Sequence, residues 1–338
     1  MLPRNKIEEL LTKVNEAIQP IEESFVAEQT PITQPLLFFC FAPRSGSTLV
    51  AQTLASSGEF GYISNFTARF WKAPAIAMAL EQTLGLGTKE NPPIKPSDFE
   101  STFGVTKSVS EPHEFGFFWN DHIPYLSDSH YVPTEQFSSK SSEKLSHHIN
   151  GIVAQSSQPF FFKNSISGLN VHLLKELCPN AKFILLLRDP LRTAQSLLWG
   201  REQVFGNTNE WFSLKPSNCS EIQARNLSAA HEVVCQVNAI YKDIFEGISD
   251  IPERCFVMDY EVFCQQTHLE ISKLFKFIEW RPENEDWRKK IPAGFAVSDH
   301  IKVDKNTYSE LRQRIIEEKV SELMQAIRTH VSNATDER

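Results

Sequence analysis

Residues 35–50 of the chain are PLLFFCFAPRSGSTLV, and this stretch decides the fold. It begins with an uninterrupted apolar run over residues 36–42, which predicts a strand buried on both faces of a sheet. Pro43 interrupts the run, and residues 47–55 have the pattern of a helix. A buried strand followed by a tight loop and a helix is typical of an α/β protein.

The loop between this strand and this helix has the chemistry of an anion site. The first amides of a helix have no partner inside it, and the helix dipole favours negative charge in front of them. Gly46 lets the backbone approach a phosphate, Ser47 and Thr48 add hydroxyl groups, and Arg44, next to Ser45, adds a guanidinium suited to phosphate-type oxygens. The alternative is an ordinary strand–turn–helix with a surface arginine.

A second stretch, residues 181–196, repeats the arrangement with the sequence AKFILLLRDPLRTAQS. Another apolar strand ends at Arg188, and Pro190 suits the first turn of a helix, where its missing amide costs little. Ser196 follows Arg188 by eight residues and lies in that helix. Arg188 should therefore emerge at the same edge of the sheet as the first loop.

The two stretches together resemble sulfotransferases that use 3′-phosphoadenosine 5′-phosphosulfate (PAPS). The loop at residues 43–48 is similar to the family's phosphosulfate-binding loop. Residues 160–164, with the helical residues 169–177 and residues 178–182, look like the family's approach to the second strand, and residues 254–261 resemble its last strand and the helix that follows. The resemblance covers roughly residues 36–280. It implies an α/β fold, a P-loop-NTPase-like three-layer domain whose central, mainly parallel sheet is flanked by helices. We expect strands at 36–42, 160–163, 182–188 and 255–259 in one sheet.

The resemblance also implies roles for particular residues. PAPS would be the co-substrate, with Arg44, Ser45, Gly46, Ser47 and Thr48 at the phosphosulfate. The 3′-phosphate would be held by Arg188 and Ser196, and Lys163 would be a cation near the transferred group. The alternative is a strand-end lysine that reaches solvent, and the resemblance favours the cation role for Lys163. No metal is expected.

The proton acceptor is harder to predict. Family members that act on trehalose have a Gly-x-x-Gly stretch leading to a catalytic glutamate, and Gly58–Gly61 looks similar, but Asn65 stands near the expected position. An asparagine cannot act as a general base. The densest nearby cluster of proton acceptors is residues 110–119, and we expect the base there, in the order His113, Glu114, Glu111. Alternatively, both glutamates serve a helix N-terminus and the aromatic residues pack in the core.

Three functions remain open on the sequence. The leading one is a PAPS-dependent sulfotransferase acting on a hydroxyl of a carbohydrate, lipid or small alcohol. The second is a P-loop kinase-like phosphotransferase, which the missing Gly-Lys-Ser/Thr motif disfavours. The third is a non-catalytic nucleotide-binding module, which Asn65 keeps open.

Composition limits the partners and the location. The 34 basic and 42 acidic residues give a net charge of −8, which disfavours binding to nucleic acid or to anionic membranes. No apolar stretch is long enough for a transmembrane segment. The six cysteines have no short paired spacing, which favours buried thiols in a reducing compartment. We expect a cytoplasmic protein.

The remaining segments give the domain prediction. Residues 5–25 have the spacing of an amphipathic helix that breaks or ends near Pro20, so we divide the chain into an N-terminal helical extension (1–30) and a sulfotransferase-like α/β domain (31–338). Helices are expected at 67–84, 221–247 and 306–331. The segments 205–220 and 298–305 should lie over the cofactor site. Asp121 and His122 should lie on the surface, and a metal site at the adjacent His147 and His148 is not expected.

Overall fold

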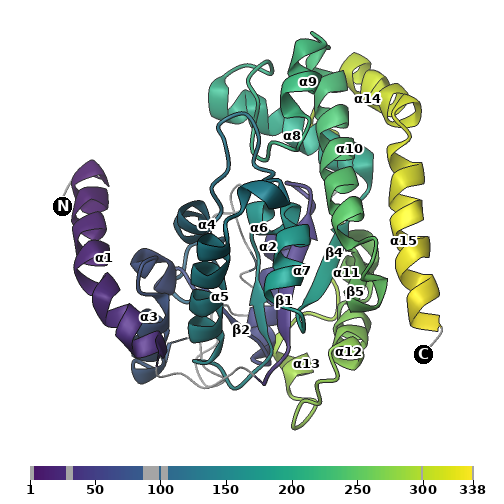
Figure 1. The fold of residues 1–338 in the computed structure, drawn as a ribbon. Coiled ribbons are helices and arrows are strands. Elements are labelled where there is room, and N and C mark those ends of the chain that lie inside the picture. Colours follow the sequence, from purple (N-terminus) through teal and green to yellow (C-terminus); the bar gives the residue numbers. More distant parts are fainter. Residues whose placement is uncertain (1–3, 28–32, 87–98, 100–105, 298–299, 337–338) are drawn as a thin grey trace.

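The computed structural model describes residues 4–27, 33–86, 99, 106–297 and 300–336. A parallel sheet lies at its centre, in the strand order β2-β3-β1-β4-β5 (Figure 1). The strands are β1 (Leu36–Phe41), β2 (Gly61–Tyr62), β3 (Phe160–Phe162), β4 (Lys182–Leu187) and β5 (Cys255–Asp259). The four expected strands share this one sheet, so the α/β prediction is confirmed.

Side chains of β1 alternate between two separate cores, which makes the fold three-layered. Leu36, Phe38 and Cys40 enter the larger core, and Leu37 and Phe39 enter the smaller one on the other face. All six residues of β1 are buried, which explains why the strand is apolar throughout.

Helices cover both faces of the sheet. The smaller core lies under α2 (Ser47–Ser57), α11 (Tyr260–Gln265), α12 (Thr267–Phe277) and α13 (Trp287–Lys290). The larger core is covered by α4 (Gly116–His122), α5 (Ser139–Val153), α6 (Ser165–Leu169), α7 (Val171–Leu177), α8 (Pro190–Phe205), α10 (Ala229–Ile248), α14 (Lys305–Glu317) and α15 (Val320–Asp336). The remaining elements are α1 (Arg4–Ala27), α3 (Pro74–Thr83), α9 (Cys219–Ala224) and the short 3₁₀ helices η1 (Thr67–Phe70), η2 (Thr134–Gln136) and η3 (Pro252–Arg254).

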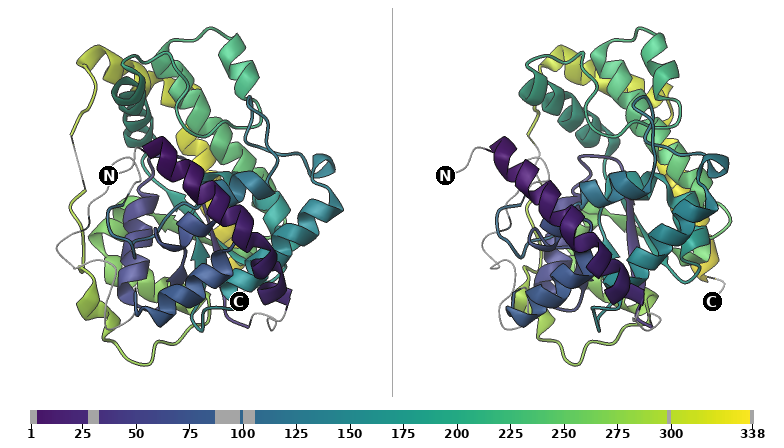
Figure 2. Two further views of the ribbon diagram at one scale, coloured as in Figure 1. Left: turned by 90° about the vertical axis from the view of Figure 1, so that its left-hand side faces the viewer. Right: turned by 60° about the vertical axis from the view of Figure 1, so that its left-hand side comes forward.

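Helix α1 crosses the outer surface of the molecule beside α3 and α5 (Figure 2). It continues through Pro20, so the expected break near that residue is wrong. Two buried polar side chains attach it. Asn15 donates to the carbonyl oxygen of Arg69 (2.8 Å), and the carboxylate of Glu22 accepts from the first amides of α3 (2.8 and 3.0 Å). The predicted domain boundary at residue 30 lies outside the described residues.

Three other helix predictions are corrected. Residues 67–84 form η1 and α3, residues 221–247 contribute to both α9 and α10, and residues 306–331 contribute to both α14 and α15. The last break lies at Lys319, whose left-handed backbone, with a φ of 53°, ends one helix before the next begins, and helical periodicity does not report such a residue. His122 is buried rather than on the surface, because its ring stacks on Phe118 and pairs with His148.

Candidate functional site

The loop from β1 to α2 has an unusual backbone that Gly46 makes possible. Arg44 and Gly46 both have left-handed conformations, with φ of 70° and 90°. A Cβ atom on Gly46 would lie 2.1 Å from the ring of Tyr260, so no larger residue fits there. The first helical hydrogen bond runs from the amide of Val50 to the carbonyl of Gly46, which leaves the preceding amides of the turn outside the helical pattern.

This loop forms one wall of a cavity of about 210 Å³ at the carboxyl edge of the sheet. Residues that follow four of the parallel strands, β1, β3, β4 and β5, contribute to it, as expected for a ligand site in an α/β fold. The lining residues are Phe41, Pro43, Arg44, Gly46, Ser47, Thr48, Leu49, Glu114, Ser165, Arg188, Phe212, Ser213 and Tyr260. We call this the first cavity. Phe212 and Ser213 belong to the segment that we expected over the site.

The structure brings Arg44, Arg188 and Ser196 together. The Nε of Arg44 donates to the Oγ of Ser196 (3.1 Å), and a terminal nitrogen of Arg188 donates to the carbonyl oxygen of Arg44 (2.7 Å). The guanidinium of Arg188 also lies over the ring of Tyr260, 4.8 Å from its centre. Two residues that are 144 positions apart in the chain are thus joined at one edge of the sheet.

Lys302 adds a third positive charge that we had not assigned. Its amide donates to the Oε1 of Gln195 (3.2 Å), and its ammonium lies 4.6 Å from the ring centre of Trp199. Burial lowers the pKa of Lys302, and the charges of Arg44 and Arg188 lower it further. The pKa of Arg44 is lowered in the same way by burial and by Arg188. Lys302 lies in the segment 298–305 that was expected near the site; residues 298–299 are outside the described part.

This arrangement fits an anionic ligand. Like charges that lower one another's pKa are relieved when an anion binds between them. Among the described residues, the buried Nε of Arg188 has no hydrogen-bond partner, and neither has the Oγ of Ser45, which is fully buried beneath the loop. The nearest carboxylate to Arg188 is that of Glu261, at 4.0 Å. A doubly charged phosphate is the group that such a site would favour.

Lys163 forms an ion pair with Glu114, which lines the first cavity. The ammonium of Lys163 lies 2.7 Å from the Oε1 of Glu114 and 3.2 Å from the Oγ1 of Thr48. Lys163 is buried, whereas 42% of the Glu114 side chain is exposed. The alternative of a lysine that reaches solvent does not describe Lys163, whose side chain is 1% exposed.

Glu114 also lines a second cavity of about 470 Å³. Glu114 therefore lies between the two cavities and borders both. The second cavity is lined by Asn65, Phe66, Arg69, Thr106, Lys107, Ser108, Val109, His113, Glu114 and Gly116. Its volume is in the range of pockets that bind small organic molecules.

The other two candidate bases have different surroundings. The Nδ1 of His113 accepts from the amide of Phe115 (2.8 Å). Its pKa is lowered to about 4, by desolvation and then by the Lys163 ammonium, although the residue is exposed. Glu111 is buried, and its carboxylate accepts from the Nε2 of Gln52 (2.8 Å) and from the amides of Lys107 (2.7 Å) and Ser108 (2.5 Å). Neither glutamate lies inside a helix N-terminus, because α4 begins only at Gly116.

Asn65, at the position where we expected a catalytic glutamate, holds the segment at residues 106–108 in place. Its Nδ2 donates to the Oγ1 of Thr106 (2.8 Å) and to the carbonyl oxygen of Ser108 (2.6 Å). It thus ties the segment before Glu111 to the wall of the second cavity.

Within the described residues, we find no helix with the length and apolar character that crossing a membrane requires. Comparison with curated proteins gives no match.

Three solved structures are similar to this chain at low identity. Sulfotransferase STF9 from Mycobacterium avium is 13% identical, with 96% of this chain and 81% of that chain covered and a TM-score of 0.49. Sulfotransferase STF1 from Mycobacterium tuberculosis H37Rv is 12% identical, with 83% of this chain and 75% of that chain covered and a TM-score of 0.48. The sulfotransferase domain from the curacin biosynthetic pathway is 15% identical, with 85% of this chain and 98% of that chain covered and a TM-score of 0.41.

The family assignment depends on a different comparison. A model of the sulfotransferase family matches residues 35–284, which include β1 to β5, the loop at Arg44 and the strand end at Arg188. The match covers most of the chain. By this match, the chain belongs to the sulfotransferase family.

Proposed function

We propose that the protein transfers a sulfuryl group from PAPS to a hydroxyl group of an organic acceptor. The observation that carries this proposal is the convergence of Arg44, Arg188 and Lys302 beside the N-terminus of α2. A single phosphate and a nearby phosphosulfate would neutralise these charges, which otherwise repel one another.

The residues of the first cavity divide between the two ends of the donor. Arg188 and Ser196 would hold the 3′-phosphate, with Lys302 beside them. Arg44, Ser45, Gly46, Ser47 and Thr48 would hold the phosphosulfate, through the amides at the start of α2 and through side chains. When bound, PAPS supplies the sulfuryl group, and no metal is needed for the residues to play these roles. The protein's contribution is then position and charge neutralisation.

Glu114 is the residue that we assign as general base. It is the one candidate of the three that lines both cavities, so its carboxylate can receive a proton from a hydroxyl in the second cavity. Lys163 fixes the carboxylate by the 2.7 Å ion pair and also reaches Thr48. Lys163 is therefore placed to neutralise charge that develops where the two cavities meet.

His113 and Glu111 are assigned other roles. The lone pair of His113 Nδ1 is engaged by the Phe115 amide, so its Nε2 carries the hydrogen in the neutral ring and donates rather than accepts. Glu111 has three donors on its carboxylate and orders the chain before it. We therefore place Glu114 first, ahead of the histidine that the sequence favoured.

The acceptor would bind in the second cavity. Its walls combine apolar Phe66 and Val109 with polar Asn65 and the charged Arg69 and Lys107. This mixture suits a molecule with both apolar and polar parts. A carbohydrate, a lipid and a small alcohol all remain within the proposal.

The cellular location is also part of the proposal. All six cysteines are unpaired and buried, which supports a reducing, cytoplasmic environment.

Calorimetry tests the donor assignment. We expect 3′,5′-adenosine bisphosphate to bind without metal, and ATP with magnesium to bind at least about tenfold more weakly, a difference of about 1.4 kcal/mol. Tighter binding of ATP with magnesium would favour a kinase-like phosphotransferase. Binding of the bisphosphate together with no transfer of sulfate to any of a panel of hydroxyl compounds would favour a non-catalytic module.

A further inference from the structure

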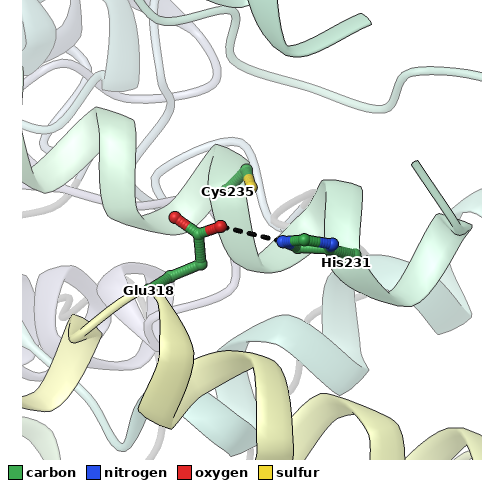
Figure 3. A group of neighbouring side chains, drawn as sticks. All are labelled: His231, Cys235 and Glu318. Atoms are coloured by element: carbon green, nitrogen blue, oxygen red, sulfur yellow. Dashed lines mark hydrogen bonds and ion pairs between the residues drawn. The ribbon is translucent and has the colours of Figure 1, made fainter. Parts of the chain in front are cut away.

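A second cluster of chemically reactive side chains lies away from both cavities. It consists of His231 and Cys235 on α10 and of Glu318, which follows the last residue of α14 (Figure 3). None of the three lines either cavity. The proposed sulfuryl transfer makes no use of them.

The geometry of the cluster is set by two packed helices. His231 and Cys235 are four residues apart, so they share one face of α10. Glu318 is brought to that face by the Nδ2 of Asn238, which donates to its carbonyl oxygen (2.9 Å), and by the left-handed turn at Lys319. The three candidate ligand atoms all lie within 4.8 Å of one another.

The three side chains offer a donor set that zinc accepts. Imidazole nitrogen, thiolate sulfur and carboxylate oxygen all bind Zn²⁺, at about 2.0–2.3 Å, which separates ligand atoms of a tetrahedral site by about 3.3–3.7 Å. The Nε2 of His231 already lies 2.8 Å from the Oε1 of Glu318, and Cys235 is buried beside them. A shift of about an ångström would give three ligands.

Arg225 contacts two of the three side chains of the cluster. Its guanidinium lies 3.4 Å from the Oε1 of Glu318 and 3.5 Å from the Sγ of Cys235. The carboxylate contact is longer than the 2.7–2.9 Å that is usual for a charge-assisted hydrogen bond. Because 47% of the Arg225 side chain is exposed, it can move into solvent at little cost.

We propose that His231, Cys235 and Glu318 form a binding site for Zn²⁺ or a related divalent transition metal, with Arg225 as the group that the metal displaces. The site would have three protein ligands and a fourth position open to water. It would fasten the end of α14 to α10. Helix α14 begins three residues after Lys302, so the metal would stabilise the chain that carries this cation without entering the first cavity.

The test measures metal binding by the full-length, reduced protein after treatment with a chelator. We expect calorimetry with zinc chloride to show one equivalent bound, and cobalt to give the charge-transfer absorption of a thiolate ligand. Cys235→Ser, His231→Ala and Glu318→Gln should each weaken binding by at least about tenfold, since even outer-shell changes cost that much. Cys178→Ser and His147→Ala, at a buried cysteine and an exposed histidine outside the cluster, are the matched controls.

Arg225→Ala should change the affinity for the metal in the opposite direction. Because the arginine competes with the metal for Cys235 and Glu318, its removal should tighten binding. Thermal unfolding without metal checks that each variant folds. If Cys235→Ser does not fold, the metal affinity of Glu318→Gln tests the site instead. Absence of stoichiometric binding, or binding that the three cluster variants leave unchanged, overturns the site; weaker binding in Arg225→Ala overturns the displacement. None of these outcomes depends on whether the protein transfers sulfate.

Discussion

The two cavities that meet at Glu114 are built in different ways. The first is made largely by the ends of parallel strands and the start of α2, and it collects positive charge. The second is walled by residues 65–69 and 106–116, most of which lie in irregular chain or short helices. In the first, the backbone topology places the functional groups; in the second, hydrogen bonds between distant segments do.

Glu111 and Glu114 show what this difference means for chemistry. The two carboxylates are three residues apart, but one is buried with three donors on it and the other stands between two cavities. Residue type therefore carries little information in this segment. The partners of each side chain determine whether it orders the chain or faces a ligand.

The largest expected effect is at the point where the cavities meet. Glu114→Gln should lower kcat by roughly 10²–10⁴-fold, since the amide cannot accept a proton. Affinity for 3′,5′-adenosine bisphosphate, measured by calorimetry, should stay near that of the wild type. Glu111→Gln is the matched control, and it should reduce the free energy of unfolding by about 1–3 kcal/mol, because a buried hydrogen-bonded carboxylate is lost. Wild-type turnover in Glu114→Gln would move the base elsewhere.

The next effect tests the first cavity alone. Arg44→Ala removes a charge-assisted contact and should weaken binding of 3′,5′-adenosine bisphosphate by about 1.5–3 kcal/mol, or roughly 10- to 150-fold. The measurement is calorimetric titration, with circular dichroism to show that the variant is folded. Unchanged affinity in a folded variant would contradict the assignment of this loop.

A smaller effect concerns the choice of donor. Adenosine 5′-phosphosulfate lacks the 3′-phosphate and should bind at least about tenfold more weakly than PAPS, a difference of about 1.4 kcal/mol. Competition against a fluorescent nucleotide would measure both affinities. Arg188→Ala and Ser196→Ala should reduce the preference, and so should Lys302→Ala, because the ammonium of Lys302 lies beside the same two arginines. Equal binding of both nucleotides by the wild type would remove the most specific support for the sulfotransferase function.

Gly116→Leu tests the second cavity alone. A Cβ atom at Gly116 would meet no heavy atom within 4 Å, and Gly116 lines the second cavity, so a leucine can be added there at the wall of the proposed acceptor site. We expect a several-fold rise in KM for the acceptor, because the leucine overfills the pocket and weakens acceptor binding by about 1 kcal/mol. The nucleotide affinity should not change. A change in nucleotide affinity instead would show that the two cavities are not separate binding sites.

The smallest effect is expected at His113. Because its pKa is about 4, the ring is already neutral at pH 5 and above, and further deprotonation adds nothing to activity there. His113→Gln should therefore change kcat by less than about tenfold and leave the pH profile between pH 5.5 and 7.5 unaltered, because general-base losses begin near 10². A larger loss, with an inflection near pH 6.5 that disappears in the variant, would restore the histidine as the base.

Much of this molecule was predictable from the sequence alone. The apolar runs at β1, β3 and β4 could be assigned because strands that are buried on both faces admit almost only apolar residues. The edge strand β5 is only partly buried, and it was assigned from its resemblance to a family strand. Arg44 and Arg188 could be placed at one edge because parallel strands of a sheet end together. These are consequences of backbone geometry, which short stretches of sequence encode locally.

Only the tertiary structure decided which side chains share an environment. The position of Glu114 depends on Lys163, 49 residues away, and the surroundings of Lys302 depend on Arg44, Arg188 and Trp199. The division of residues 306–331 into two helices depends on one left-handed residue, Lys319, and it places Glu318 beside His231. Contacts of this kind arise when distant segments pack against each other, and neither periodicity nor residue type along the chain encodes them.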